Sequence, residues 1–577
     1  MKIFIKFAVV GLIFLFQASV QAADYYVNVN NSTPGSGTSW STAFDTIQGG
    51  IDAASSAGGE VWVAKGTYYV YSTSNADTLE MKSGADLYGG FDGTETSRDQ
   101  RDWNANETVI DGHQSAGSGN QVQHVVTGSD NATIDGFTIT GGKARSGGGQ
   151  PPKRGNRPRA TSPDEIFESG GGGSGGGMLI FRTNPTVSNC TFTGNSAGKG
   201  GAVYVMVATE YPTQTPNDAP TFTDCVFSDN SASSRGGGVS NDVATHPTFI
   251  GCTFVSNTCD AKGGAMYNDF GCSPTLINCL FAKNTAHRAT AMGCDGSSSP
   301  KLVNCTVTDN YAYDVGSGIY TGSYLAGANE PTLVNCIVWG NENQWGGPTD
   351  FNVWHENHFY ISYSLIGQGF TSYGEGVIQE DGADPLFVNP DNGDYRLQAG
   401  SPCINTGTNS DGDVPDTDLD GESRSGNADM GAYEYTGIIE TGSLQVTIEP
   451  QGAIDAGAQW KADSGDWQDS GATVSDLSAG EHTVSFGTVK GWTTPTSAAV
   501  TIIAGETAPV TGTYAPIQGD MDGDGFLTLA DLIIVLRICA GEEVLPETAL
   551  SVADVNDDDR IGPTEAVYIL WKVSGMR

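Results

Sequence analysis

The chain has 577 residues, of which 79 are glycine, and its 27 lysine and arginine residues stand against 67 aspartate and glutamate residues, a net charge of −40. So acidic a surface repels nucleic acids and other anionic polymers at long range, and we expect no nucleic-acid partner. The length predicts two or more domains, and a chain so rich in glycine builds a large core only if the glycines belong to a repetitive architecture.

Residues 1–22 have the features of a secretory signal peptide. Lys2 and Lys6 precede the apolar run 7–16, and the segment ends on the small residue Ala22, which fits the cleavage pattern. No later stretch reaches the roughly 18 apolar residues of a membrane span. We therefore expect an exported mature chain without a transmembrane segment, secreted or held at the cell surface.

Residues 175–345 repeat a short pattern. In each copy a cysteine is followed by phenylalanine or valine two residues later and by asparagine five residues later, and a glycine pair precedes most copies. Successive cysteine numbers differ by 35, 27, 27, 26 and 31. A period near 27 with short strands and Gly/Asn turns indicates a solenoid with two or three strands per period. The cysteines are Cys190, Cys225, Cys252, Cys279, Cys305 and Cys336.

Stacked strands place each repeat position above itself, so we expect internal columns of cysteine and phenylalanine and a ladder of asparagines. This region resembles the right-handed parallel β-helix, or pectate-lyase-like, superfamily. Two further stretches, 37–68 and 384–434, look like flanks of exported proteins of this kind and extend the expected β-helix to residues 23–437. Side chains of one column point the same way, so the cysteines should stay reduced, whereas Cys259 and Cys272 could form a local bridge.

A basic insertion interrupts the repeat at residues 143–174. It is expected to be a loop extruded from one turn, followed by a glycine tract. Two interpretations remain open: a solvated disordered segment, or a contact with an acidic polymer or with the acidic body of another copy. Its cations are Lys143, Arg145, Lys153, Arg154, Arg157 and Arg159.

Residues 438–515 change to longer alternating strands, for example 444–448 and 480–486. This pattern predicts a small antiparallel β-sandwich. Exposed tryptophans can stack on sugar rings, but in so small a domain they more often fill the core, and we expect the core for all three. They are Trp460, Trp467 and Trp492.

Residues 516–577 contain two acidic loops, each followed by an apolar helical stretch, with 34 residues between the loop starts (554 − 520). Their oxygen-bearing residues fall at the ligand positions of an EF-hand-type calcium loop. The first loop offers Asp520, Asp522, Asp524, the carbonyl of Phe526, Thr528 and Asp531. The second offers Asp554, Asn556, Asp558, the carbonyl of Arg560, a water beside Gly562, and Glu565. Two solvated acidic turns are the alternative interpretation.

This duplicated loop-and-helix unit resembles the type I dockerin module. The resemblance implies a small α-helical module that binds Ca²⁺ and a cohesin-like protein partner. Asp559 stands where a glycine normally makes the sharp turn, so the second site should bind less tightly. Loop positions 10 and 11 are Leu529-Ala530 and Pro563-Thr564 rather than the small hydroxyl residues common in dockerins, which argues against a standard cohesin.

Short catalytic signatures are missing from the sequence, and the acidic run 411–422 is interpreted as a capping loop. The predicted function is therefore a noncatalytic extracellular β-helix, a surface, matrix or polysaccharide-binding component attached through its dockerin-like tail. The alternative is a polysaccharide lyase or glycoside hydrolase that the tail recruits to a complex. An exposed groove with two or more carboxylates and a lysine or arginine within reach would favour the enzyme.

Overall fold

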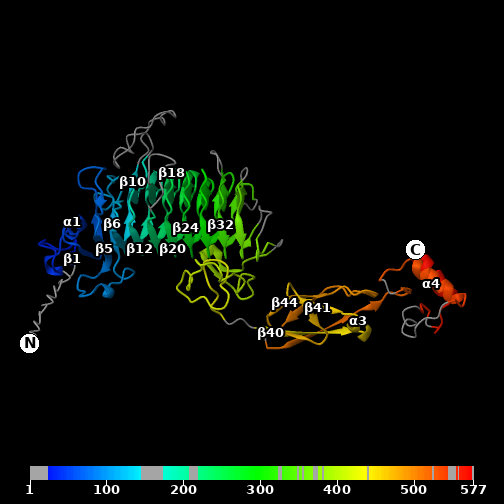
Figure 1. Ribbon diagram of the computed structural model, residues 1–577. Helices are drawn as coiled ribbons and strands as arrows, with labels where there is room; N and C mark the ends of the chain where they lie inside the picture. The colour runs from blue at the N-terminus through cyan, green and yellow to red at the C-terminus, as the bar shows by residue number, and fades with distance from the viewer. Residues whose placement is uncertain are drawn as a thin grey trace, which may run out of the picture. The chain divides into compact units, whose positions relative to one another are not determined.

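The computed structural model describes residues 24–144, 173–206, 219–322, 328–346, 350–353, 357–367, 374–379, 383–437, 441–503, 505–522, 525–542, 554–556 and 558–574. The predicted signal peptide, most of the basic insertion and Asp524 lie outside these residues. Contacts divide the chain into two units, Met1–Thr436 and Gly437–Arg577 (Figure 1). Within the described residues, no helix is long and apolar enough to cross a bilayer.

The first unit is a parallel β-helix whose regular coils contribute one strand to each of four sheets. The sequence analysis expected two or three strands per coil, and this expectation was wrong because strands of two to five residues leave room for a fourth. Sheet I contains β1 (Tyr25–Val27), β2 (Gly59–Ala64), β5 (Ala85–Phe91), β8 (Thr133–Asp135), β12 (Thr186–Ser188), β16 (Thr221–Thr223), β20 (Thr248–Ile250), β24 (Thr275–Ile277), β28 (Lys301–Val303), β32 (Thr332–Val334) and β36 (Tyr360–Ser362).

Sheet II comes next along the chain, and from β8 onward a short turn joins each strand of sheet I to a strand of this sheet. It contains β3 (Gly66–Tyr69), β6 (Thr108–Asp111), β9 (Thr138–Thr140), β13 (Thr191–Thr193), β17 (Val226–Ser228), β21 (Thr253–Val255), β25 (Leu280–Ala282), β29 (Thr306–Thr308), β33 (Ile337–Trp339) and β37 (Leu365–Ile366). Sheet III contains β10 (Lys143–Ala144), β14 (Ser196–Lys199), β18 (Ser231–Arg235), β22 (Thr258–Lys262), β26 (Thr285–Arg288), β30 (Tyr311–Ala312) and β34 (Glu342–Asn343).

Sheet IV completes each coil. It contains β4 (Leu79–Glu80), β7 (Val126–Thr127), β11 (Met178–Phe181), β15 (Val203–Met206), β19 (Val239–Asp242), β23 (Met266–Asp269), β27 (Met292–Cys294), β31 (Ile319–Thr321) and β35 (Phe351–Val353). The turn from sheet III to sheet IV uses the predicted glycine pair. Gly236 has φ +62°, and a Cβ on Gly237 would lie 2.3 Å from the carbonyl oxygen of Gly264 in the next coil.

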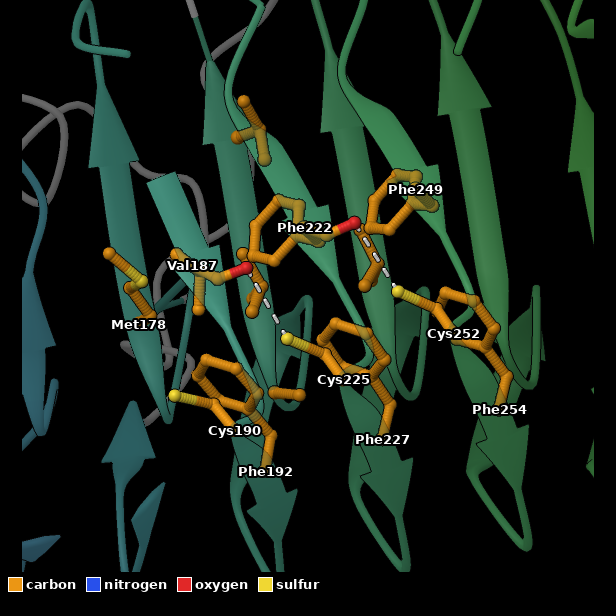
Figure 2. Packing of buried hydrophobic residues seen from close by; sticks show 14 of the residues in the cluster. Met178, Val187, Cys190, Phe192, Phe222, Cys225, Phe227, Phe249, Cys252 and Phe254 are labelled. Atoms are coloured by element: carbon orange, nitrogen blue, oxygen red, sulfur yellow. Dashed lines mark hydrogen bonds between the residues drawn. The ribbon is translucent and has the colours of Figure 1, made fainter. Parts of the chain in front are cut away.

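The core inside the coils consists of the predicted columns. Phe192, Phe227, Phe254 and Phe281 stack face to face, with centroids 5.2, 4.7 and 4.5 Å apart. Figure 2 shows Cys190, Cys225 and Cys252, each two residues before a stacked phenylalanine, with their sulfurs pointing into the core. The Sγ of Cys225 donates to the carbonyl of Val187 at 3.5 Å, one coil earlier. Burial raises the pKa of the Cys252 thiol well above its usual value, so this thiol is unreactive.

All eleven cysteines are free, and ten of them are buried. The predicted reduced column is therefore confirmed. The local bridge between Cys259 and Cys272 does not form. Cys259 packs between Ala232 and Ala286 of sheet III, whereas the Cys272 sulfur lies 3.3 Å from the Thr245 hydroxyl.

The predicted asparagine ladder is confirmed. Each side-chain Nδ2 donates to the Oδ1 of the asparagine in the following coil, at 2.8–3.1 Å, and that Oδ1 also accepts the backbone N–H of the preceding asparagine. The last amide, on Asn341, donates to Oδ1 of Asp350 at 2.7 Å. The ladder runs through Asn195, Asn230, Asn257, Asn284, Asn310 and Asn341.

Two non-repetitive segments pack on the β-helix, one at its first coils and one against its side. Helix α1 (Ile47–Ala57), which the sequence analysis missed, buries Ile47, Ile51 and Ala54 in the first coils. Residues 383–437 form no further coil. They contain the antiparallel pair β38 (Phe387–Asn389) and β39 (Asp394–Leu397) and pack against outward residues of sheet II such as Leu280 and Ile337.

The second unit begins with two small sheets packed face to face. One contains β43 (Thr473–Ser478), β40 (Thr441–Glu449) and β47 (Thr507–Thr513), and the other β42 (Gln468–Asp469), β41 (Gln459–Ala462), β44 (Gly480–Phe486) and β46 (Ala498–Ile502). The predicted all-antiparallel pairing is wrong at one place, because β40 and β47 are parallel. Helix α3 (Gln451–Asp455) joins β40 to β41.

The three tryptophans of this sandwich differ in burial. Trp460 is fully buried, and Trp492 packs against the same core, as predicted. Trp467 is 46% exposed, so its predicted place in the core is wrong; its ring lies beneath Lys461, whose Nζ is 5.3 Å from the ring centroid. The pair β45 (Trp492–Thr493) and β48 (Ala515–Pro516) then leads to the tail, which contains α4 (Leu529–Cys539) and α6 (Pro563–Val573).

Candidate metal centre and charged ladder

The first acidic loop of the tail brings three carboxylates together. One oxygen each from Asp520, Asp522 and Asp531 lies within 4.8 Å of the other two. Asp531 is buried and accepts the backbone N–H groups of Met521 and Thr528, both at 2.7 Å. Its position is fixed because it belongs to the capping box with which Thr528 begins helix α4. Backbone donors therefore hold the carboxylate of position 12 toward the loop.

The turn of this loop depends on Gly525. Its φ is +85°, and its N–H donates to Oδ2 of Asp520 at 2.9 Å. Phe526, whose carbonyl is the expected ligand of position 7, has a solvent-exposed side chain. Asp524 lies outside the described residues, so the structure brings together three of the four predicted carboxylates of this loop.

The second loop makes the same turn without glycine. Asp559 adopts φ +59°, the left-handed conformation that aspartate tolerates. Its N–H donates to Oδ2 of the buried Asp554 at 2.6 Å, while the N–H groups of Asn556 and Asp558 donate to Oδ1 of Asp554 at 3.2 Å. Among the described residues, three convergent acidic oxygens occur in the first loop and not in the second.

Glu565, the predicted position-12 ligand of the second loop, carries a buried oxygen without a partner. Its Oε2 accepts the N–H of Gly562 at 2.7 Å, whereas Oε1 has no hydrogen bond although the residue is 1% exposed. Burying a carboxylate oxygen without a partner raises the free energy of the folded chain unless a cation binds that oxygen. The donors of both loops are oxygens only, the set that Ca²⁺ prefers, and the residues present therefore fit that ion.

The two helices that follow the loops pack together through one face and expose apolar side chains on another. Val535 and Ile569 are buried between them. The exposed residues recur at helical spacing on each helix, with exposures of 43–66%. The outer surface of these two helices is therefore largely apolar. The exposed residues are Leu529, Ile533 and Leu536 on α4, and Val567, Leu570 and Trp571 on α6.

A ladder of charges, which the sequence analysis missed, lies on the outer side of sheet IV in the β-helix. Register places four cations one above another at the end of sheet III, and each reaches an aspartate of the following coil. The signal was present in the sequence, because the aspartates 242, 269 and 295 repeat with the period of the cysteines. The pairs are Lys199–Asp242 at 2.8 Å, Arg235–Asp269, Lys262–Asp295 at 2.9 Å, and Arg288–Asp314.

Tyrosines complete this charged ladder. The Tyr204 hydroxyl donates to Asp242 at 2.9 Å, and the Tyr267 hydroxyl donates to Asp295. Cations cover the tyrosine rings, and the Cζ of Arg235 lies 5.1 Å from the Tyr267 centroid. The result is a layer of rings and carboxylates beneath the lysine and arginine side chains.

Burial dominates the electrostatics of the carboxylates in this ladder. Burial raises the pKa of Asp242, but the adjacent Lys199 and Arg235 and the Tyr204 hydroxyl more than offset the effect, and the pKa lies below its usual value. At Asp269 burial has a larger effect than the opposing charge of Arg235, and the pKa of this carboxyl rises to about 6. The aspartates at 242, 269 and 295 keep only 4–7% of their side-chain surface exposed. The carboxylates of this ladder thus bind lysine, arginine and tyrosine side chains of neighbouring coils.

Acidic side chains of the run 411–422 also bind other groups of the protein. Asp411 and Asp413 both pair with Lys301, at 2.9 and 2.7 Å, which fastens the segment 383–437 to sheet I. Asp418 accepts the backbone N–H groups of Asp420 and Glu422. These contacts support its interpretation as a capping loop.

Two protein-family models match residues of the β-helix coils. The family model of the right-handed β-helix region matches residues 215–364, and the repeat of Chlamydia polymorphic membrane proteins matches residues 189–206. No curated protein sequence matches the chain.

Solved structures resemble the β-helix at low identity. PfbA, a surface adhesin of Streptococcus pneumoniae, has 12% identity and a TM-score of 0.28, with 62% of this chain and 88% of PfbA covered. The A-module of a mannuronan C-5 epimerase of Azotobacter vinelandii has 14% identity and a TM-score of 0.26, with 62% and 97% covered.

Proposed function

We propose that this chain is an extracellular β-helix protein without catalytic activity, a surface or matrix component held in place by a calcium-folded, dockerin-like tail. The observation that carries the proposal is the convergence of Asp520, Asp522 and Asp531 at the start of a helix whose outer face is apolar. The predicted signal peptide supports export, and the matched repeat belongs to a family of membrane proteins, which supports a place at the cell surface.

Calcium and folding of the tail should be coupled. Carboxylate oxygens within 4.8 Å repel one another without a cation, and Oε1 of Glu565 is buried without a partner. A calcium ion in each loop removes both penalties, so it stabilises the arrangement of α4 against α6. In the first loop the ion would be held by Asp520, Asp522, Asp524 and Asp531. In the second it would be held by Asp554, Asn556, Asp558 and Glu565.

The partner of the tail is proposed to be a cohesin-like protein with an apolar recognition surface. The exposed residues of α4 and α6 supply matching apolar area, while Leu529 occupies a loop position where dockerins commonly have a hydroxyl residue. Because calcium fixes the two helices against each other, binding of this partner should require calcium.

Calcium titration of the mature chain tests the tail. We expect millimolar calcium, the range of extracellular modules, to increase the helical far-UV circular dichroism and chelator to reverse it. A variant with both Asp522→Ala and Asp558→Ala should show no change, whereas Asp260→Ala, at an exposed β-helix residue, should respond like the parent chain. Identical spectra of the parent with calcium and with chelator would contradict the proposal.

The second candidate is a polysaccharide lyase or glycoside hydrolase. The observation that favours it is the charged ladder, which places aspartates, cations and tyrosine hydroxyls within hydrogen-bonding distance of one another. Acid–base catalysis needs such groups to reach a sugar linkage, and here burial and mutual pairing prevent this.

We therefore expect no turnover of pectins, alginates, xylans or glycosaminoglycans by the mature chain. Ultraviolet absorbance would detect the unsaturated ends made by a lyase, and a reducing-end assay would detect hydrolysis. Product from the parent chain that disappears in Asp242→Asn, with unchanged circular dichroism, would establish the enzyme and refute the noncatalytic function. Retention on an immobilised polysaccharide without product would support a binding role.

A further inference from the structure

The first loop of the tail contacts a turn of the β-sandwich. This turn, residues 489–493, is closed by a hydrogen bond from the N–H of Trp492 to the carbonyl of Val489 at 3.2 Å. Strand β45 of the turn pairs with β48, which joins Trp492 to Pro516. The N–H of Ile517 donates to the carbonyl of Gly491 at 3.1 Å. The chain thus enters the first loop while bonded to the turn.

The ligand-bearing part of the loop meets the same turn. A Cβ on Gly525, at loop position 6, would lie 3.2 Å from Cγ of Lys490 and 3.3 Å from the backbone nitrogen of Gly491. A Cβ on Gly491 would lie 3.8 Å from Oδ2 of Asp520, the ligand of position 1. These distances are shorter than most real Cβ contacts, so a side chain at position 525 would have to push Lys490 or Gly491 aside, in addition to the strain of the positive φ.

The turn itself belongs firmly to the sandwich. Val489 is buried in the sandwich core, and Trp492 packs against that core. A Cβ on Gly452 would lie 3.0 Å from Cζ2 of Trp492. The Tyr514 hydroxyl donates to the carbonyl of Gly487 at 2.5 Å and joins the strand before the tail to the start of the turn.

Among the described residues of the second loop, 554–556 and 558–565, no equivalent contact with the sandwich is present. Its position 6, Asp559, is solvent-exposed, and so are Asp558 and Arg560. The two loops of the tail therefore differ in their surroundings as well as in sequence.

We infer that the turn 489–493 is the docking surface for the first loop, and that calcium in this loop locks the tail to the sandwich while calcium in the second loop does not. The inference rests on the proposed calcium binding. Without the ion, repulsion among Asp520, Asp522 and Asp531 displaces the loop backbone from which Gly525 meets the turn. With the ion, that backbone is fixed and the contact is complete, so the apolar face of α4 is held rigidly to the β-sandwich.

Hydrogen exchange of the mature chain, followed by mass spectrometry, tests this inference. At free calcium ten times the dissociation constant, linkage predicts that exchange in peptides covering 487–494 and 514–519 slows by about tenfold relative to chelator. Asp522→Ala should abolish this slowing and leave the response of α6 intact. Asp558→Ala should leave the slowing in 487–494 and 514–519 intact and abolish the response of α6.

A matched pair of substitutions at loop position 6 separates docking from metal binding. Asparagine tolerates the left-handed conformation, so Gly525→Asn should retain calcium binding by calorimetry but lose protection of the turn, because its side chain needs the space of Lys490. Asp559→Asn should leave the turn protected. Calcium binding without any change of exchange in 487–494, or an equal effect of Asp522→Ala and Asp558→Ala, would overturn the inference alone. Absence of calcium binding by calorimetry would overturn the proposed function as well.

Discussion

Replacing Phe254 with alanine should lower the free energy of unfolding of the β-helix by about 3–5 kcal/mol. Phe254 is fully buried between Phe227 and Phe281, and its ring also meets Phe249 edge-on at 5.6 Å. The cavity would be bounded by rings fixed in their own coils, so the surroundings cannot collapse to fill it.

Urea unfolding of residues 24–436, which belong to one compact unit, measures this effect. Phe254→Leu should lose less than half as much, since most of the volume is kept. The neighbouring Thr253→Ala, on the outer side of the same strand, should change the free energy by no more than about 0.5 kcal/mol. Equal losses for Phe254→Ala and Thr253→Ala would contradict the stacked core.

Replacing Asp242 with alanine should be nearly as damaging, at about 3–5 kcal/mol at pH 7. The substitution leaves the Lys199 ammonium and the Tyr204 hydroxyl without their acceptor, and it cuts the connection between two successive coils. Replacement by asparagine should be milder, because the amide oxygen still accepts the Tyr204 hydrogen bond. Asp260→Ala, an exposed aspartate of the adjacent coil, is the control.

The pH dependence gives an independent check. The pKa of Asp242 is lower in the folded chain than in the unfolded chain, so its stabilisation is present above the unfolded value and disappears as the pH falls through the folded value. The difference between the parent and Asp242→Ala should therefore be full at pH 7 and shrink below about pH 4. A difference that stays constant from pH 7 to pH 3 would show that Asp242 acts through packing rather than through charge.

The inward half of the β-helix could be predicted from the sequence because its determinants recur at one spacing. Cysteine, phenylalanine and asparagine each occupy a fixed place in the period, and each fills a column whose environment is set by the coil before and after it. The number of strands per coil could not be predicted from such recurring residues. Strands as short as Tyr311–Ala312 carry too few residues to show an alternation.

The outward side was harder to predict because its contacts join residues of different coils. Lys199 and Asp242 are 43 residues apart, and neither has an unusual neighbour in the sequence. Likewise, nothing in the Asp384–Glu434 region indicates that it packs sideways against sheet II. In the tail, the ligand spacing fixed the candidate residues in advance, but the contact of Gly525 with Lys490 depends on how two modules meet.

The asparagine ladder has a direction. An asparagine side chain both donates and accepts, so it passes the hydrogen-bond chain to the next coil, and all the amide dipoles of the ladder align in one direction. At the last step Oδ1 of Asp350 accepts the hydrogen bond of Asn341, so the ladder ends on a carboxyl oxygen that faces the positive end of the aligned dipoles. Because every step of the ladder repeats the same hydrogen bond, a whole coil inserted between Asn195 and Asn341 would add one asparagine to the ladder and leave its last contact with Asp350 in place.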